Sequence, residues 1–172
     1  MTMKEQEEGS PSVVAAVGPR EAASWDETFM GVALVVARRS KDPSTQVGAA
    51  IVSEENRILS LGYNGTPNGW PDSTFPWGKE GDLLDTKYPY VVHAERNAVL
   101  NFGGIHSQLR GGKIYTTHFP CGECAKEIVQ VGIAEVVYLH DHSMADSSTA
   151  ASLRMFRECG LTVRQLEGYG LS

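Results

Sequence analysis

Cysteine is scarce in this sequence, and long hydrophobic runs do not occur. The 172 residues include 3 cysteines, Cys121, Cys124 and Cys159, which are too few and too unevenly placed for a disulfide framework, so we expect free thiols in a reducing compartment. No stretch approaches the run of about 18 apolar residues that a membrane span needs, and the N-terminus is acidic and polar rather than basic and then apolar. The sequence therefore predicts a soluble, cytoplasmic protein without a membrane span.

Positive charge is also limited. Lys and Arg total 15 against 21 Asp and Glu, which gives a formal net charge of −6, and the basic residues form no long run. A large nucleic-acid surface held by phosphate contacts is therefore disfavoured. A small anionic substrate stays compatible with this charge, because two or three local donors in a pocket can coexist with an acidic exterior.

The length of the chain and its hydrophobic content of 41% suit one globular domain with a single core. Residues 1–22 are polar and small, contain Pro11 and Pro19, and lack a sustained apolar period. We predict a mobile leader there. The domain is expected to span 23–172.

Helix and strand patterns alternate along the rest of the chain. The segment 24–27, Ser-Trp-Asp-Glu, has the spacing of a capping box and precedes an apolar run, which predicts a first helix. Two β-like segments joined by a polar turn at 54–56 predict a hairpin. The predicted elements are helix 25–39, strands 47–52 and 57–63, helix 90–102, strand 113–117, a helix from Pro120 to near Gly132, strand 136–139, helix 147–158 and strand 161–166. A helix between the last two strands favours their parallel pairing, so the expected fold class is α/β with a mixed five-stranded sheet covered by helices.

The segment 64–90 lies between the second strand and the second helix. It contains 8 glycines and prolines, which interrupt a regular helix or strand too often for either to form over this segment. A loop of this length suggests a functional role.

Two short motifs carry the chemistry: His-Ala-Glu at 93–95 and Pro-Cys-Gly-Glu-Cys at 120–124, each at the expected start of a helix. One imidazole and two thiolates suit Zn²⁺, and three protein ligands leave the fourth tetrahedral position for water, as in catalytic sites. The positive end of a helix would stabilise the thiolates. Glu95 would not share the ligand direction of His93, so we expect it to reach the bound water as a proton shuttle.

Each motif has a simpler reading when it is taken alone. A lone C-x-x-C is also typical of a redox motif or half of a structural zinc knuckle, a lone His93 of a partly buried histidine, and a lone Glu95 of a solvated carboxylate. Their combination, H-x-E followed by P-C-x-x-C, is the signature described for zinc nucleobase deaminases. Two rival functions stay open. One is a deaminase of another base or of tRNA, although the acidic net charge argues against tRNA. The other is a non-catalytic zinc module that binds nucleotides; such a module would have no use for Glu95.

With these motifs the chain resembles the deoxycytidylate deaminases of the cytidine and deoxycytidylate deaminase superfamily, from about Trp25 to Leu166. The further matching segments are 39–43 (RSKDP), 46–49 (QVGA), 62–69 (GYNGTPNG) and 85–90 (DTKYPY). The resemblance implies a three-layer α/β/α fold, a homo-oligomer that is commonly a hexamer, and conversion of dCMP to dUMP with release of ammonia. That reaction would supply dUMP for thymidylate synthesis.

The same resemblance implies roles for individual residues. Glu95 would be catalytic, with His93, Cys121 and Cys124 as the zinc ligands. The implied substrate-binding residues are Asn64 at the sugar, Ala94, Phe119 at the base, and Arg39, Ser40 and Lys41 near phosphate groups of substrate or effector. Simpler readings stay open for several of them: a solvated helix end for Arg39 and Lys41, a turn position for Asn64, and the core for Phe119.

Regulation by nucleotides is a further implication. Relatives are commonly activated by dCTP and inhibited by dTTP at a second site near subunit contacts. The loop 62–69 resembles that effector region, with Tyr63, Asn64, Gly65 and Asn68 as the expected contacts. Allosteric control by these two nucleotides is therefore predicted.

The sequence departs from some relatives in two places. The loop 66–90 contains neither the cysteines nor the histidines that build an additional structural zinc in those relatives, so we predict one Zn²⁺ per chain. Some relatives also place a substrate-contacting tyrosine after the fourth strand, where this chain has His140-Asp141-His142-Ser143. We interpret His140 and His142 as exposed loop histidines in preference to ligands of a second metal.

Overall fold

The computed structural model describes residues 18–141 and 147–169. The helices are α1 (Trp25–Ala37), α2 (Ala94–Leu100), α3 (Gly122–Gln130) and α4 (Ser147–Glu158), with short 3-10 helices η1 (Leu83–Asp85) and η2 (His106–Leu109). The strands are β1 (Gly48–Val52), β2 (Ile58–Tyr63), β3 (Lys113–His118), β4 (Glu135–His140) and β5 (Thr162–Gln165). The predicted α/β class is confirmed.

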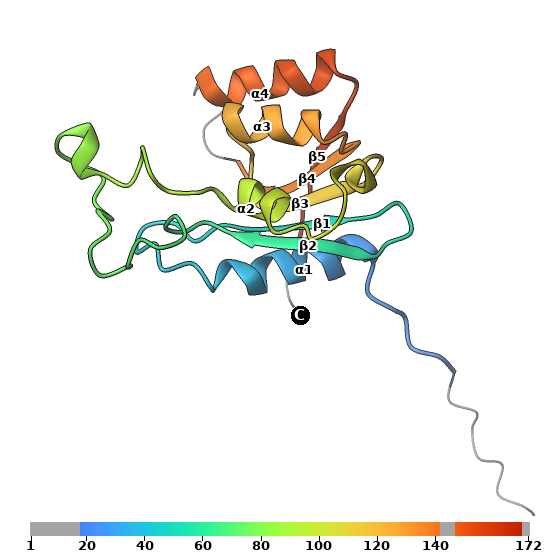
Figure 1. The fold of residues 1–172 in the computed structure, drawn as a ribbon. Coiled ribbons are helices and arrows are strands. Elements are labelled where there is room, and N and C mark those ends of the chain that lie inside the picture. Colours follow the sequence, from blue (N-terminus) through green and yellow to red (C-terminus); the bar gives the residue numbers. More distant parts are fainter. Residues whose placement is uncertain (1–17, 142–146, 170–172) are drawn as a thin grey trace, which may run out of the picture.

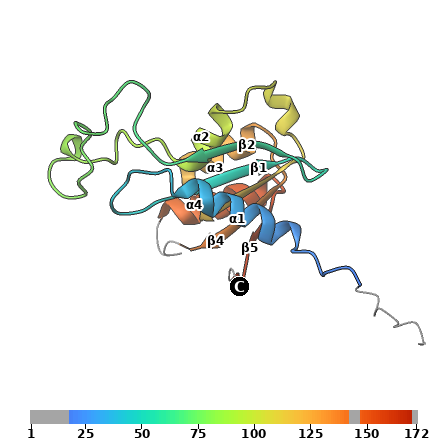
Figure 2. The same cartoon turned by 90° about the horizontal axis from the view of Figure 1, so that it is seen from below.

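The five strands form one mixed sheet in the order β2-β1-β3-β4-β5. β1 pairs antiparallel with β2 and with β3, whereas β3, β4 and β5 run parallel. Helix α1 lies on one face of the sheet, and α2, α3 and α4 lie on the other (Figures 1 and 2). The expected parallel pairing of the last two strands and the expected three layers are confirmed.

Successive residues of the central strands feed two separate hydrophobic clusters, because strand side chains alternate between the two faces. In β1, Ala49 and Ile51 pack with the cluster under α2, α3 and α4, whereas Ala50 and Val52 pack with the cluster under α1. All five residues of β1 are buried. β1 is thus covered on both faces of the sheet. The site lies at the end of the sheet where β1 begins and β2 and β3 end.

The predicted capping box is present at the start of α1. The backbone N–H of Glu27 donates to Oγ of Ser24, and the Glu27 carboxylate accepts from the backbone N–H of Ser24 at 2.7 Å. The hairpin turn holds Asn56 at a φ of 60°, a conformation that asparagine tolerates better than most residues. Both local patterns therefore fold as their sequences indicate.

The predicted helix over 90–102 is wrong at its start. Residues 90–92 precede α2, which begins at Ala94. Val92 forms an antiparallel bridge with Gly65, with backbone hydrogen bonds of 2.9 and 3.0 Å in the two directions. This pairing uses the N–H and the C=O of Val92 and favours extended backbone there, which leaves His93 as the N-cap.

Gly62 allows α2 to pack directly on β2. A Cβ at this position would lie 2.2 Å from the carbonyl oxygen of Ala94 and 2.3 Å from the backbone nitrogen of Ala98. Distances this short to backbone atoms cannot be relieved by a side-chain rotation. The absence of a side chain at Gly62 therefore determines how closely β2 and α2 pack, and α2 positions His93 and Glu95.

The long loop after β2 extends from one end of the sheet (green in Figures 1 and 2). Four aromatic rings organise it: Trp70 contacts Phe75 and Tyr90 at centroid distances of 5.2 and 5.1 Å, and Phe75 contacts Trp77 at 4.6 Å. As predicted, the loop lacks a long helix or strand; it holds only η1 and the bridge at Gly65. Aromatic packing therefore supports a segment that contains neither cysteine nor histidine.

Two expectations concern parts of the chain that the structure does not describe. Most of the predicted leader, residues 1–17, lies outside the described residues, as does His142. Within 18–141 and 147–169, none of the helices combines the length and apolar character needed to cross a bilayer.

Candidate zinc and catalytic site

Three side chains able to bind a metal converge from the starts of two helices. His93 is the N-cap of α2, Cys121 is the N-cap of α3, and Cys124 lies in the first turn of α3. The Nδ1 atom of His93 lies 3.4 Å from Sγ of Cys121 and 3.4 Å from Sγ of Cys124. Tetrahedral zinc with a Zn–S distance of about 2.3 Å and a Zn–N distance of about 2.0 Å needs a sulfur–nitrogen separation of about 3.5 Å. The three residues therefore fit a zinc ion with one nitrogen and two sulfur ligands.

The two thiols differ in their affinity for a proton. A hydrogen bond from Cys124 lowers the pKa of Cys121 to about 3, aided by His93 and opposed by burial. The pKa of Cys124 is raised, because its thiol donates that hydrogen bond and is buried. The hydrogen bond to Cys121 also raises the pKa of His93. Both thiols have to be deprotonated when they bind a metal ion, so metal binding releases protons from this pair.

Glu95 lies beside the three ligands on the first turn of α2. Its Oε2 atom is 3.6 Å from Sγ of Cys124, and the residue is only 4% exposed. Burial raises the pKa of the Glu95 carboxyl, although the nearby His93 opposes this shift. A raised pKa favours a carboxyl that both takes up and releases a proton during a reaction. Glu95 has the position and the environment of a proton carrier.

A cavity of about 360 Å³ opens over these groups, and we call it the catalytic cavity. Its lining includes His93, Glu95 and Cys121, together with three residues that the sequence analysis assigned to substrate. Those three are Asn64, Ala94 and Phe119. They lie together, but their contacts with substrate stay a prediction.

Phe119 is a core residue that also reaches the wall of the catalytic cavity. Its ring packs edge-on against Tyr138 at a centroid distance of 4.9 Å and against Phe156 at 6.2 Å, as a core residue would. It is 6% exposed and also lines the catalytic cavity. The core therefore holds the ring in a fixed position at the cavity wall.

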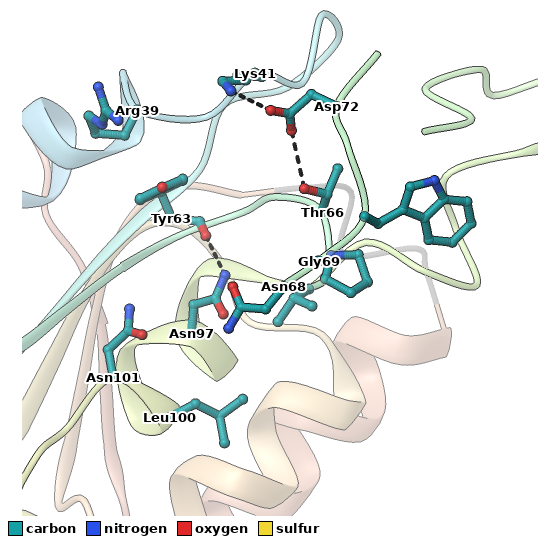
Figure 3. A pocket seen from close by; sticks show the side chains of 13 residues that line it. Arg39, Lys41, Tyr63, Thr66, Asn68, Gly69, Asp72, Asn97, Leu100 and Asn101 are labelled. Carbon is teal, nitrogen blue, oxygen red and sulfur yellow. Dashed lines mark hydrogen bonds and ion pairs between the residues drawn. The ribbon is translucent and has the colours of Figure 1, made fainter. Parts of the chain in front are cut away.

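Arg39 and Lys41 line a second cavity of about 440 Å³, which we call the outer cavity (Figure 3). Tyr63 and Asn68, two of the expected effector contacts, line the same cavity. Lys41 pairs with Asp72, whose other oxygen accepts from the hydroxyl of Thr66 at 3.1 Å. The side chains of Asn97 and Asn101 approach from α2 and its C-cap (Figure 3). Two cations and several amides thus surround this space.

Ser40 and Gly65, which were expected to contact phosphate and effector, lie outside both cavities. Ser40 is 3% exposed, and its hydroxyl accepts from the backbone N–H of Asp42 at 3.3 Å. Gly65 is paired with Val92 through its backbone. Neither residue belongs to the lining of the two cavities. Their expected contacts with phosphate or effector stay untested predictions.

The catalytic cavity also contains residues to which the sequence analysis gave no role. They are Asp42, Thr45, Val47, Lys87, Tyr88, Val91, His118 and Thr149. Asp42 and Lys87 occur inside the matched segments 39–43 and 85–90, but 45 residues separate them and no local pattern pairs them. His118 is the last residue of β3, and the centroid of its ring lies 5.2 Å from that of His140 on the neighbouring strand β4. Only the fold brings these residues together.

A zinc-type ligand set beside a buried carboxyl and an open cavity defines a class of metal-dependent hydrolytic sites. Comparison with known families then specifies the class: the family profile "Cytidine and deoxycytidylate deaminase zinc-binding region" matches residues 23–140. The chain belongs to this family and is a hydrolytic deaminase.

Individual relatives agree with this assignment. The deoxycytidylate deaminases of Mus musculus and Homo sapiens are 48% and 49% identical to the chain, over 82% of its length and 79% of theirs. The crystal structure of dCMP deaminase from the cyanophage S-TIM5, in complex with dCMP and dUMP, matches with a TM-score of 0.65 at 27% identity. It covers 81% of this chain and 95% of that one. The resemblance to deoxycytidylate deaminases that the sequence motifs indicated is confirmed.

Proposed function

We propose that this protein hydrolyses dCMP to dUMP and ammonia and so supplies dUMP for thymidylate synthesis. The observation that carries the proposal is the arrangement of Glu95 beside His93, Cys121 and Cys124 at a cavity that also contains Asn64. A module that only binds zinc has no use for a buried carboxyl whose pKa is raised. The names of the mouse and human relatives favour dCMP over other cytosine compounds.

The residues of the site divide the reaction between them. A zinc ion bound by the three ligands would lower the pKa of a water molecule toward about 7 and so supply the nucleophile. Glu95 takes a proton from the attacking water and delivers a proton to N3 of cytosine, which makes C4 electrophilic. After the C4–O bond has formed, Glu95 takes the remaining proton from the new C4 hydroxyl group and passes it to the amino group. The C4–N bond then breaks, the C4=O bond forms, and ammonia is released. Phe119 holds the base by its ring, and Asn64 holds the sugar.

The test is turnover of a small panel of substrates. Ammonia release, or the loss of cytosine absorbance, is measured with dCMP, dCTP, deoxycytidine and CMP, each with and without added dCTP as effector. Preferential turnover of dCMP supports the proposal. Turnover of another member of the panel would replace the substrate, and zinc-loaded protein that turns over none of them would overturn the enzymatic proposal.

We further propose that the outer cavity binds the nucleotide effectors, with dCTP as activator and dTTP as inhibitor. Arg39 and Lys41 suit the charge of a triphosphate, and the amides of Asn68, Asn97 and Asn101 can bind a sugar or a base. Because Arg39 and Lys41 line this cavity, they fit contacts with effector phosphates better than contacts with the phosphate of dCMP. Sigmoidal dCMP kinetics that dCTP makes hyperbolic would support this proposal.

The remaining expectations concern stoichiometry and assembly. We propose one zinc per chain, because the described residues contain one group of three metal-binding side chains, and a homo-oligomer, most commonly a hexamer by the resemblance. Exposed apolar side chains at Leu84, Leu100 and Ile105 are available for subunit contacts. Metal analysis measures the first quantity. Light scattering measures the second against the chain mass of 18.7 kDa.

A further inference from the structure

A buried ion pair forms one wall of the catalytic cavity. The side chains of Asp42 and Lys87 are 1% and 7% exposed, and both residues line the cavity. Such a pair overcomes its desolvation cost only when hydrogen bonds satisfy its remaining polar atoms. Asp42 meets this condition, because its Oδ1 accepts from the backbone N–H groups of Ser44 at 2.8 Å and Thr45 at 3.2 Å. Its Oδ2 accepts from Lys87 and from the side-chain amide of Asn64, the latter at 3.3 Å.

This arrangement fixes the direction of the Asn64 amide. Its Nδ2 atom donates to Oδ2 of Asp42 and to the carbonyl oxygen of Thr45 at 3.0 Å, which uses both of its N–H groups. Its Oδ1 accepts from the backbone N–H of Val47 at 2.8 Å. Turning the amide over would set its oxygen against the Asp42 carboxylate and the Thr45 carbonyl, and its N–H groups against the Val47 N–H. Of its hydrogen-bonding capacity, one lone pair on Oδ1 is left for a ligand.

We propose that the Asp42–Lys87 pair makes Asn64 a pure acceptor toward the catalytic cavity, so that Asp42 and Lys87 act as positioning residues in the recognition of a sugar hydroxyl. The inference rests on the proposed deamination of dCMP and on the contact already expected between Asn64 and the sugar, and it adds the two residues that fix the direction of the Asn64 amide. In dCMP the free sugar hydroxyl is the one on C3′, and its proton is the donor that the Asn64 oxygen accepts. A nucleotide without that proton leaves a buried acceptor without a partner.

Lys87 has a second effect on the same wall. Its backbone N–H donates to the carbonyl of Gly78 at 3.1 Å, and its carbonyl accepts from the N–H groups of Tyr90 at 3.1 Å and Val91 at 2.8 Å. The residue is therefore the centre of a turn that presents Val91 to the cavity. The ion pair to Asp42 attaches this turn to the segment that follows α1.

The experiment compares dCMP with its 3′-fluoro-3′-deoxy analogue. Fluorine is similar in size to a hydroxyl but cannot donate a hydrogen bond. Wild-type protein should prefer dCMP in kcat/KM by about 10- to 100-fold, the range expected when a buried acceptor loses its partner. In Asp42→Asn an NH2 group replaces the oxygen that accepts from Asn64, because the other oxygen still accepts from the N–H groups of Ser44 and Thr45. The Asn64 amide loses this acceptor and is free to turn. The preference should then fall to within about threefold.

Two further variants separate positioning from general damage. Lys87→Met should lose the preference, and the conservative Lys87→Arg should keep it, because only the latter retains a cation beside Asp42. The matched control is Lys113→Met, which breaks the ion pair with Glu135 at 3.0 Å; neither residue lines the cavity. This control should keep the wild-type preference. A drop in kcat for both substrates with the preference intact in Asp42→Asn and Lys87→Met would overturn the proposal.

The wild-type protein alone gives an independent test. If it turns over the 3′-fluoro analogue as well as dCMP, the proposal is wrong, whether or not the variants fold. Calorimetric binding of dUMP and of its 3′-fluoro analogue repeats the comparison without catalysis. Zinc-loaded protein that prefers dUMP in this assay but does not deaminate dCMP would support the inference and overturn the proposed function.

Discussion

Tyr63 and Asn64 are adjacent in the chain, but their side chains line different cavities. Tyr63 lines the outer cavity (Figure 3), and Asn64 lines the catalytic cavity. Lys41 and Asp42 divide in the same way. In extended backbone, successive side chains point to opposite sides. The segments that carry these residues therefore form a wall shared by the two cavities.

A first prediction concerns the response to the effector dCTP in the outer cavity. Replacing Arg39 by Met should raise the dCTP concentration needed for half-maximal activation by about tenfold or more, because a charge-assisted contact with phosphate is lost. Activation curves at fixed dCMP measure the change. The control is Arg38→Met, which removes an exposed arginine that does not line the cavity. An equal shift in both variants would argue against an effector site in the outer cavity.

A second prediction concerns Glu95. Glu95→Gln keeps the size of the side chain but removes the proton carrier, so kcat should fall by about 100- to 10,000-fold while the zinc content stays at the wild-type value. Ammonia release and metal analysis on the same sample measure the two quantities. Glu123→Gln, at an exposed carboxylate inside the C-x-x-C segment, is the matched control. Substantial activity in Glu95→Gln would refute the shuttle.

The metal ligands give a third prediction. Cys124→Ala should abolish zinc binding and turnover together, because a buried ligand of the ion is removed. Cys159→Ala should change neither, since Cys159 is exposed and lies outside the ligand group. Metal content and turnover are measured for both. Retention of zinc by Cys124→Ala would mean that the ion is held elsewhere.

A fourth prediction tests the packing of α2 on β2. Gly62→Ala should destabilise the fold by about 3 kcal/mol or more, because the added Cβ meets backbone atoms of the helix. Gly103→Ala is the control, since a Cβ there meets nothing within 4 Å and φ is not positive. Denaturant unfolding measures both free energies. Similar values for the two variants would show that α2 can move away from the strand at little cost.

A fifth prediction concerns acid stability. A hydrogen bond from Arg164 lowers the pKa of Asp26, with a further contribution from Tyr115 against the effect of burial. Because the folded pKa lies below the unfolded value of about 3.9, this pair stabilises the fold above that pH. The contribution is lost as the pH falls through the folded pKa.

Arg164→Met tests this dependence. At pH 7 the variant should be less stable than wild type by about 1 kcal/mol, a modest value because Arg164 and Asp26 are about one-third exposed. The difference should shrink as the pH falls below the unfolded pKa of about 3.9 and through the lower folded pKa. Denaturant unfolding across this range measures it, and a difference that does not change with pH would assign the loss to packing.

Local patterns in the sequence identified the group of His93, Cys121 and Cys124, the neighbouring Glu95, and the order of helices and strands. A capping box at Ser24 or a C-x-x-C motif at Cys121 can be recognised within a few residues of sequence. The interactions that form each motif also join residues only a few positions apart. The α/β class follows from that order, since a helix between two strands favours a parallel crossover.

The tertiary structure alone decided how the cavities are lined. Asp42 meets Lys87 across 45 residues of chain, and a pairing at that separation depends on the path of the loop between them. The bridge from Gly65 to Val92 similarly overrode the helical pattern of residues 90–92. Arg39 and Lys41 belong to the outer cavity, whereas Asp42 belongs to the catalytic one. Backbone direction and long-range packing decide which of the two cavities a side chain faces. The spacing of residues along the chain does not contain this information.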